Sequence, residues 1–433
     1  MARMARSAAS LPLYTLDLAR RYWAPLLFVY LLGTLLHGLM LRGIVWLGLQ
    51  NQTLGLLAFS LAVLVTLATT IVMFLMLRPG LPVLDHELLE RSRRARGTGA
   101  DQRPNVNERE RRIVDAVAMS LLPFLIFYSA WGLFAEELRA YAARAQVEAG
   151  LDGYVAILDF NPLGVPLLVL AVAFLCRTVC EQFYFRNNSK ALGIATAFFE
   201  TVFAFFFVVT VVELASTLWE WLGQRLVWVE ATAMFHTLLE QLAELTALPV
   251  IDLVLGTAAA VVWTWELLKD GLIQPLLWLT IAAVVFGADV DRTETLFRPG
   301  SRAQRVHDAA LARTPGVLLQ LGERASRGLR EKYLPFLNAF RFILRTSPIY
   351  YLSFCLYYAL LELGFSWLER GVLLAVGPAD FLGWWWPWLA PLSIAVDALH
   401  EVLRVCLLAA TFEVVLRRML DRQPGQRARP ARI

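Results

Sequence analysis

Long apolar runs separated by short Arg-rich segments are the dominant pattern of this chain. The cleanest run extends from Leu54 to Leu77 without one charged side chain. A helix rises about 1.5 Å per residue, so about 20 apolar residues cross a hydrocarbon layer of about 30 Å. The pattern therefore predicts membrane-spanning helices instead of a water-soluble core.

We predict an all-α, polytopic membrane protein with eight such spans. The Arg-rich segments between the spans are expected on the cytoplasmic side, which also places both termini there. A ninth apolar run, 247–265, is predicted to form a re-entrant or interfacial hairpin, because the basic segment that begins at Arg292 must also be cytoplasmic. The predicted spans are 22–41, 54–77, 113–134, 161–181, 191–218, 271–288, 346–367 and a last helix that ends at Leu416.

Two segments with one apolar face are predicted to be helices on the outer membrane surface, 136–159 and 224–245. Both follow a predicted outward span, and both contain more acidic than basic residues. Helical periodicity with one apolar face is typical of helices that lie in the membrane interface. The apolar face of the first segment consists of Leu138, Tyr141, Ala142 and Ala145.

A short junction occurs twice, as Leu-Arg-Pro-Gly at 77–80 and as Phe-Arg-Pro-Gly at 297–300. The interval from Gly80 to Arg112 equals in length the interval from Gly300 to Lys332. We interpret this as two tandem four-helix repeats, which share one orientation because an even number of crossings returns the chain to the same side. The predicted repeats are 1–190, with cytoplasmic loop 78–112, and 191–433, with cytoplasmic loop 289–345.

Composition supports a membrane environment and bounds the partners. Hydrophobic residues make up 58% of the chain, charged residues 18%, and the mean hydropathy is +0.56, which leaves too little polar surface for a soluble globule. Only three of the 40 basic residues are lysines, which indicates a GC-rich genome and a bacterial inner (plasma) membrane. The Arg clusters lie between apolar runs, so we expect them to contact anionic lipid head groups and not nucleic acid.

The last predicted helix carries a stripe of ionisable residues. Asp397, His400, Glu401 and Arg404 follow the spacing i, i+3, i+4, i+7 and therefore share one helix face. Charged groups inside the hydrocarbon layer cost about 2.5–3.5 kcal/mol each, so these four should pair with one another or face water. The stripe is either an internal ladder of salt bridges or a site for an ion or a proton.

Three more ionisable residues lie at a similar outer depth in other predicted helices. Glu213, Glu362 and His37 could converge on the stripe if their helices surround the last one. His37 and His400 could also hold a haem from facing helices, but two histidines without a second matching pair are weak evidence. We therefore predict no cofactor.

Two further groups of polar residues lie in or beside the predicted spans. Glu200 is a second buried carboxylate, for which Arg177 or Arg186 is a plausible partner. Cys176 and Cys180 share a helix face, but a pair without additional Cys or His ligands does not predict a metal site.

No sequence motif in the chain indicates catalysis. Phosphate-binding, zinc-protease and serine-hydrolase motifs are absent from the sequence, so we predict no enzymatic activity. The favoured hypothesis is a transporter or channel for a small solute or ion, with proton coupling as an option. The alternative is a non-catalytic scaffold or accessory subunit, as a homo- or hetero-oligomer. A water-accessible cavity that reaches Asp397 would favour transport, whereas a stripe sealed against neighbouring helices would favour the scaffold.

Overall fold

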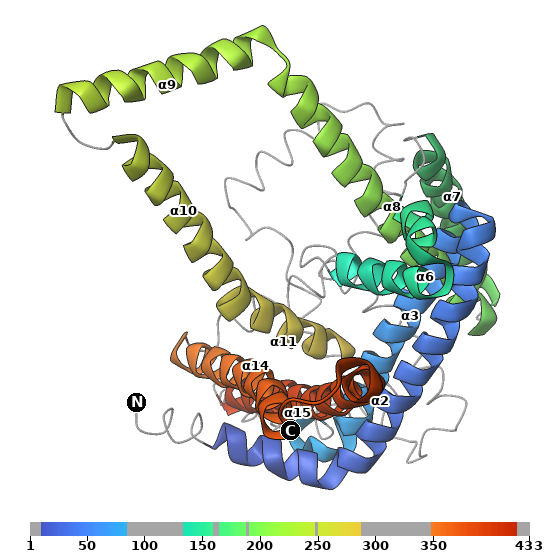
Figure 1. Ribbon diagram of the computed structural model, residues 1–433. Helices are drawn as coiled ribbons and strands as arrows, with labels where there is room; N and C mark the ends of the chain where they lie inside the picture. The colour runs from blue at the N-terminus through green and yellow to red at the C-terminus, as the bar shows by residue number, and fades with distance from the viewer. Residues whose placement is uncertain are drawn as a thin grey trace, which may run out of the picture.

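The computed structural model describes residues 10–84, 133–158, 164–187, 190–246, 250–286 and 348–421, and every regular element in these ranges is helical (Figure 1). Four helices in the described part are long and apolar enough to cross a membrane: Leu11–Gln50, Gln52–Gly80, Ala191–Gly223 and Asp252–Val285. The predicted all-helical fold is confirmed for the described residues, and the four candidate spans are compatible with the predicted membrane protein. Nearly all of the predicted span 113–134, the second junction at 297–300 and most of both Arg-rich loops lie outside the described residues. The eight spans and the repeat therefore stay predictions.

The first two helices, α2 (Leu11–Gln50) and α3 (Gln52–Leu77), form a close antiparallel hairpin. Asn51 joins them, and its side chain accepts a hydrogen bond from the backbone N–H of Leu54 at 3.1 Å. At Gly33, an added Cβ would lie only 2.4 Å from Oγ1 of Thr69. Small residues at such crossings let helix backbones approach closely. The hairpin is followed by a short 3-10 turn, η1 (Arg78–Gly80), at the first Arg-Pro-Gly junction.

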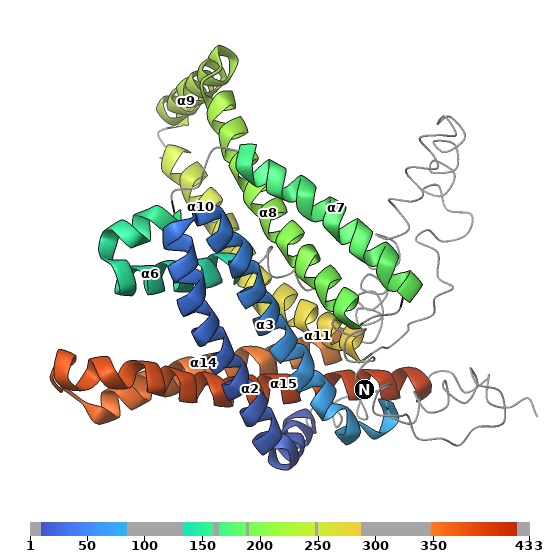
Figure 2. The ribbon, with the colours of Figure 1, turned by 90° about the vertical axis from the view of Figure 1, so that its right-hand side faces the viewer.

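Helix α6 (Leu133–Leu158) packs across the end of this hairpin that contains Asn51 (Figure 2). Its predicted apolar face is present, since Tyr141, Ala142 and Ala145 are all buried. That face contacts α2 and α3, and therefore binds protein where the sequence led us to expect lipid. Gly150 has a φ of 70°, a left-handed conformation that favours glycine, and interrupts α6 there.

Tyr141 fits into a notch formed by two glycines of the α2–α3 hairpin. A Cβ added to Gly48 would lie 2.0 Å from the Tyr141 hydroxyl oxygen, and one added to Gly55 would lie 2.5 Å from Cα of Gly48. The ring of Tyr141 also contacts Phe59, with ring centroids 5.5 Å apart. Burial raises the pKa of Tyr141 to about 12, so the hydroxyl in the notch is neutral at physiological pH.

We expect Gly48→Ala to lower the free energy of unfolding by about 1–3 kcal/mol, because the new methyl group overpacks the notch. Adding Tyr141→Phe should restore most of the loss, since it removes the clashing oxygen. Gly55→Ala is the control, and Tyr141→Phe should not rescue it, because its methyl group also meets the backbone of Gly48. Thermal and denaturant unfolding in detergent measure the two single glycine variants and the two double variants. Equal rescue of both glycine variants would contradict this packing.

Helices α7 (Gly164–Asn187) and α8 (Lys190–Gly223) form a second hairpin, and α8 packs against α3. The Phe59 ring of α3 and the Phe205 ring of α8 have centroids 5.2 Å apart. Helix α9 (Leu226–Thr246) and helix α10 (Val250–Leu268) follow. In Figure 1 the distal half of α8, α9 and most of α10 extend away from the remaining helices.

Helix α10 continues through a π-helical turn, η2 (Lys269–Ile273), into α11 (Gln274–Val285). The sequence-based hairpin at 247–265 would need a reversal before the span 271–288, and the structure instead joins both runs in one continuous helix. The charged residues between the two apolar runs are typical of a loop, yet none of them prevents helix formation. Gly271 has the lowest helix propensity of the residues there, and the π-turn accommodates it.

The chain ends in a third hairpin of α14 (Pro348–Val376) and α15 (Trp386–Asp421), joined through a π-helical turn, η3 (Phe381–Trp385). In Figure 2 this hairpin crosses α2 and α3. Helix α15 contacts α2, α3, α11 and α14. These two helices match the seventh and eighth predicted spans in position. They are not among the four candidate spans.

Candidate functional site

The deep end of the α15 stripe is closed by α11. Nη2 of Arg404 donates a hydrogen bond to Oε1 of Glu401, one turn earlier on the same helix. The Arg404 guanidinium also lies over the ring of Trp278 on α11, 4.4 Å from its centroid. A desolvated cation over an aromatic face is stabilised by about 2 kcal/mol. The charge of Arg404 is therefore balanced within the protein.

The middle of the stripe is held by α14. Nε2 of His400 lies 3.2 Å from Oε2 of Glu362, whose side chain is 40% exposed. The ring of Phe365 packs beside the imidazole, with centroids 5.1 Å apart. The structure thus brings Glu362 to the stripe, as the sequence suggested.

The end of the stripe that carries Asp397 is open, since Asp397 is exposed. The other three residues are partly buried, with side chains that are 15% (His400), 21% (Glu401) and 14% (Arg404) exposed. Three polar atoms near the deep end are buried without a hydrogen-bond partner among the described residues: Oε2 of Glu401, Nε of Arg404 and the hydroxyl of Tyr358. Internal water commonly serves such atoms.

Beyond Arg404 the helix is apolar and packed. Residues 405–413 of α15 are all buried. Glu413, at the end of this stretch, accepts hydrogen bonds from the backbone N–H groups of Val83 and Leu84 at 2.7 and 3.2 Å. It thereby fastens the chain after the Arg78–Gly80 turn to α15. Sequence reasoning missed Glu413, although a lone carboxylate in an apolar stretch was an available signal.

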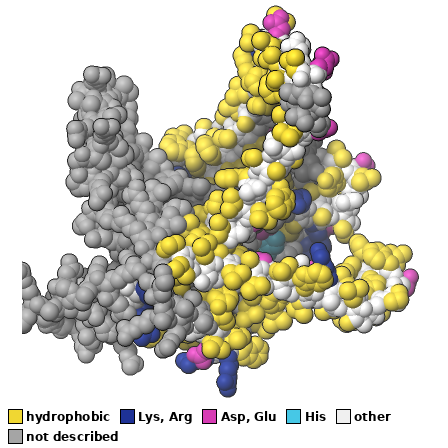
Figure 3. Space-filling model, turned by 90° about the vertical axis from the view of Figure 1, so that its left-hand side faces the viewer, with side chains coloured by type: hydrophobic (Ala, Val, Ile, Leu, Met, Phe, Trp, Pro, Cys, Tyr) yellow, Lys and Arg dark blue, Asp and Glu magenta, His cyan; other side chains and the backbone are white. Residues whose placement is uncertain are grey.

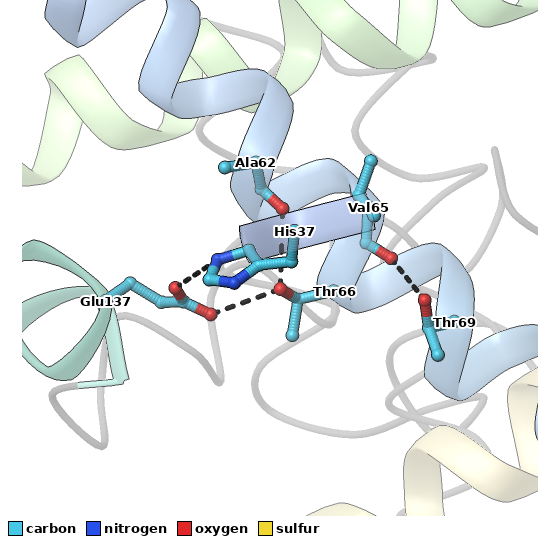
Figure 4. A network of polar contacts seen from close by, with 6 residues as sticks. All are labelled: His37, Ala62, Val65, Thr66, Thr69 and Glu137. Atoms are coloured by element: carbon cyan, nitrogen blue, oxygen red, sulfur yellow. Dashed lines mark hydrogen bonds and ion pairs between the residues drawn. The ribbon is translucent and has the colours of Figure 1, made fainter. Parts of the chain in front are cut away.

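His37 does not reach the stripe and belongs to a separate network (Figure 4). Its Nε2 lies 2.9 Å from Oε2 of Glu137 on α6, and the Thr66 hydroxyl donates to Oε1 of the same carboxylate at 3.2 Å. The sequence analysis did not identify Glu137 as a partner of His37, because it placed residues 136–159 in a helix on the membrane surface. His37 and His400 therefore bind different carboxylates.

The remaining carboxylates take two different positions. Glu213 is exposed on the distal half of α8 and is not brought to the stripe. Glu200 is 1% exposed at its side chain and lies 3.6 Å from Nη2 of Arg177, whose side chain is 8% exposed. This buried pair joins α7 to α8 and confirms one of the two partners that the sequence offered for Glu200.

The arrangement can pair charges and carry protons, and no described group of three or more His, Cys, Asp or Glu residues could hold a metal ion. A small pocket between α3, α7 and α8 is lined mainly by apolar side chains and by no stripe residue. Comparison with protein-family models, curated proteins and solved structures finds no match. Function is therefore inferred from the geometry of the site itself.

Proposed function

We propose that the chain is a non-catalytic membrane scaffold or accessory subunit, in which the α15 stripe is a structural element. The observation that supports this most directly is the closed deep end of the stripe. Arg404 is engaged by Glu401 and Trp278, and buried apolar residues follow it along α15. A solute or ion entering beside Asp397 would meet no continuous polar path through the described residues.

The stripe has a clear structural use in this proposal. Its side chains join α15 to Glu362 on α14 of the same hairpin and to Trp278 on α11, which lies far from α15 in sequence. Polar contacts give helix packing in a membrane a defined register, because apolar side chains alone do not distinguish protein from lipid. A scaffold requires such a fixed arrangement to present constant surfaces to its partners.

The proposed setting is a bacterial inner membrane with both termini in the cytoplasm. The excess of Arg over Lys supports the bacterial origin, and the positive-inside rule supports the orientation. Hydrophobic side chains cover much of the described surface in Figure 3, with acidic ones at the projecting ends. Bilayer lipid, anionic head groups and partner subunits are the proposed contacts.

Transport of a proton or small ion is the second candidate, and one observation favours it. The side chains of Asp397 and Glu362 are accessible to solvent and lie beside His400. Together the three residues form a polar entrance. Buried polar atoms without a described partner lie further in, where water could connect them. A conformational change would still have to open the packed stretch after Arg404.

The deciding experiment compares wild-type protein with Asp397→Asn in liposomes that contain a pH-sensitive dye. Under an imposed pH gradient or membrane potential, we expect wild-type proton flux to equal that of protein-free liposomes. Asp397→Asn should behave identically and fold normally, because Asp397 is exposed. Native mass spectrometry of gently solubilised membranes should also find the chain in an assembly of fixed stoichiometry. Flux that disappears in Asp397→Asn would overturn the scaffold in favour of transport.

A further inference from the structure

The helix formed by α10, η2 and α11 is too long for one membrane crossing. The part of it that forms a candidate membrane span, Asp252–Val285, has 34 residues and is therefore about 51 Å long. A straight rod of that length would fit a hydrocarbon layer of about 30 Å only at a tilt of about 54°, whereas membrane helices tilt by about 0–40°. Such a rod would also place Glu266, Lys269 and Asp270, which lie near its middle, at the bilayer centre.

The two halves of this rod have different surroundings. Helix α11 is largely buried, and Leu279 and Ile281 are each 1% exposed. The described side chains of α10 are almost all exposed, including large apolar ones such as Leu253, Val261 and Trp263. The change from exposed to buried side chains occurs at η2. From Lys269 to Val285 the helix is about 25 Å long, which is at the short end of the lengths that cross a bilayer.

The backbone at η2 is suited to bending. A π-turn already departs from the regular hydrogen-bond pattern, and a Cβ on Gly271 would meet nothing within 4 Å. Pro275 has no N–H group and cannot bond the carbonyl of Gly271 four residues earlier. The hydroxyl of Tyr351 on α14 donates a hydrogen bond to the carbonyl of Leu272. The α11 side of the turn is thus fixed, and the α10 side is exposed.

We propose that η2 (Lys269–Ile273) is a hinge, and that in a bilayer α10 bends about it to bring its apolar surface into contact with lipid. The bend leaves Glu266, Lys269 and Asp270 at the membrane surface, where water solvates their charges. It also removes the apolar surface of α10 from water without requiring another protein. Contact between α10 and lipid therefore drives the bend.

Distance measurement between two spin labels tests this hinge in the full chain. Labels at Ala258 and Val284, in a variant whose native cysteines are replaced, would lie about 39 Å apart along a straight helix. In lipid nanodiscs we expect a distance below about 30 Å, because a bend brings the labels closer than a straight helix of constant rise allows. Labels at Ile194 and Glu220 on α8 have the same sequence separation and should keep the straight-helix distance. A third sample adds Gly271→Ala and Pro275→Ala to the hinge pair and should return it to the straight-helix distance.

Contact with lipid has its own measurement. A spin label at Val261, which is 68% exposed, should be accessible to oxygen and protected from a water-soluble nickel reagent in nanodiscs. A wild-type hinge pair that keeps the straight-helix distance in nanodiscs would overturn the hinge, whatever the double variant does. A short distance with a nickel-accessible Val261 label would overturn the lipid contact.

Discussion

Replacing Glu401 with glutamine is expected to lower the free energy of unfolding by about 3–5 kcal/mol. The amide keeps the shape of the side chain but cannot balance the charge of Arg404, which has α11 on one side and the apolar part of α15 after it. Trp278 compensates only part of the loss, because a cation over an aromatic ring is stabilised less than one beside a carboxylate. Denaturant unfolding in detergent micelles measures the difference.

Two variants separate loss of charge from loss of packing at this position. Replacing both partners, Glu401→Leu with Arg404→Met, should recover most of the stability, since no uncompensated charge remains. Asp397→Asn, four residues from Glu401 but exposed, should change the free energy of unfolding by less than about 0.5 kcal/mol. A Glu401→Gln variant as stable as wild type would show that the stripe does not hold α11 and α15 together.

Sequence periodicity was sufficient to find the helices and the stripe. The apolar runs that begin at Leu54 and Ala191 became α3 and α8 with similar bounds, because their length and composition leave few alternatives to a helix. The spacing also placed the four stripe residues on one face, because the face on which a residue lies depends only on its position within its own helix. Glu362 could be assigned to the stripe only as an option that depended on helix order.

The partners of the buried carboxylates were the least predictable feature. Glu413 bonds backbone N–H groups 330 and 329 residues away, and backbone groups leave no signal in the sequence. His37 pairs with Glu137 instead of the stripe because α6 packs on the α2–α3 hairpin. The periodicity of α6 is the same whether its apolar face meets lipid or protein, so sequence alone could not distinguish the two.

The sequence offered two partners for Glu200, and the structure pairs it with Arg177. Replacing either member of this pair is expected to cause the second large loss of stability. Both side chains are almost fully buried between α7 and α8, and their nearest atoms are 3.6 Å apart. The Arg177 guanidinium also lies 5.7 Å from the ring centroid of Phe203. Here the pair lies in the helix interface itself, so water cannot solvate a charge that loses its partner.

We expect Glu200→Gln to destabilise the protein by about 3–5 kcal/mol and Arg177→Met to destabilise it by a similar amount, because each removes one member of a buried ion pair. The double variant should be much closer to wild type than the sum of the two single effects, and this non-additivity identifies direct coupling. Arg144 and Glu148, an exposed i,i+4 pair on α6, provide the control, for which coupling of about 0–1 kcal/mol is expected. Additive losses at Arg177 and Glu200 would mean that each residue is held by other contacts, and that the α7–α8 hairpin does not depend on this pair.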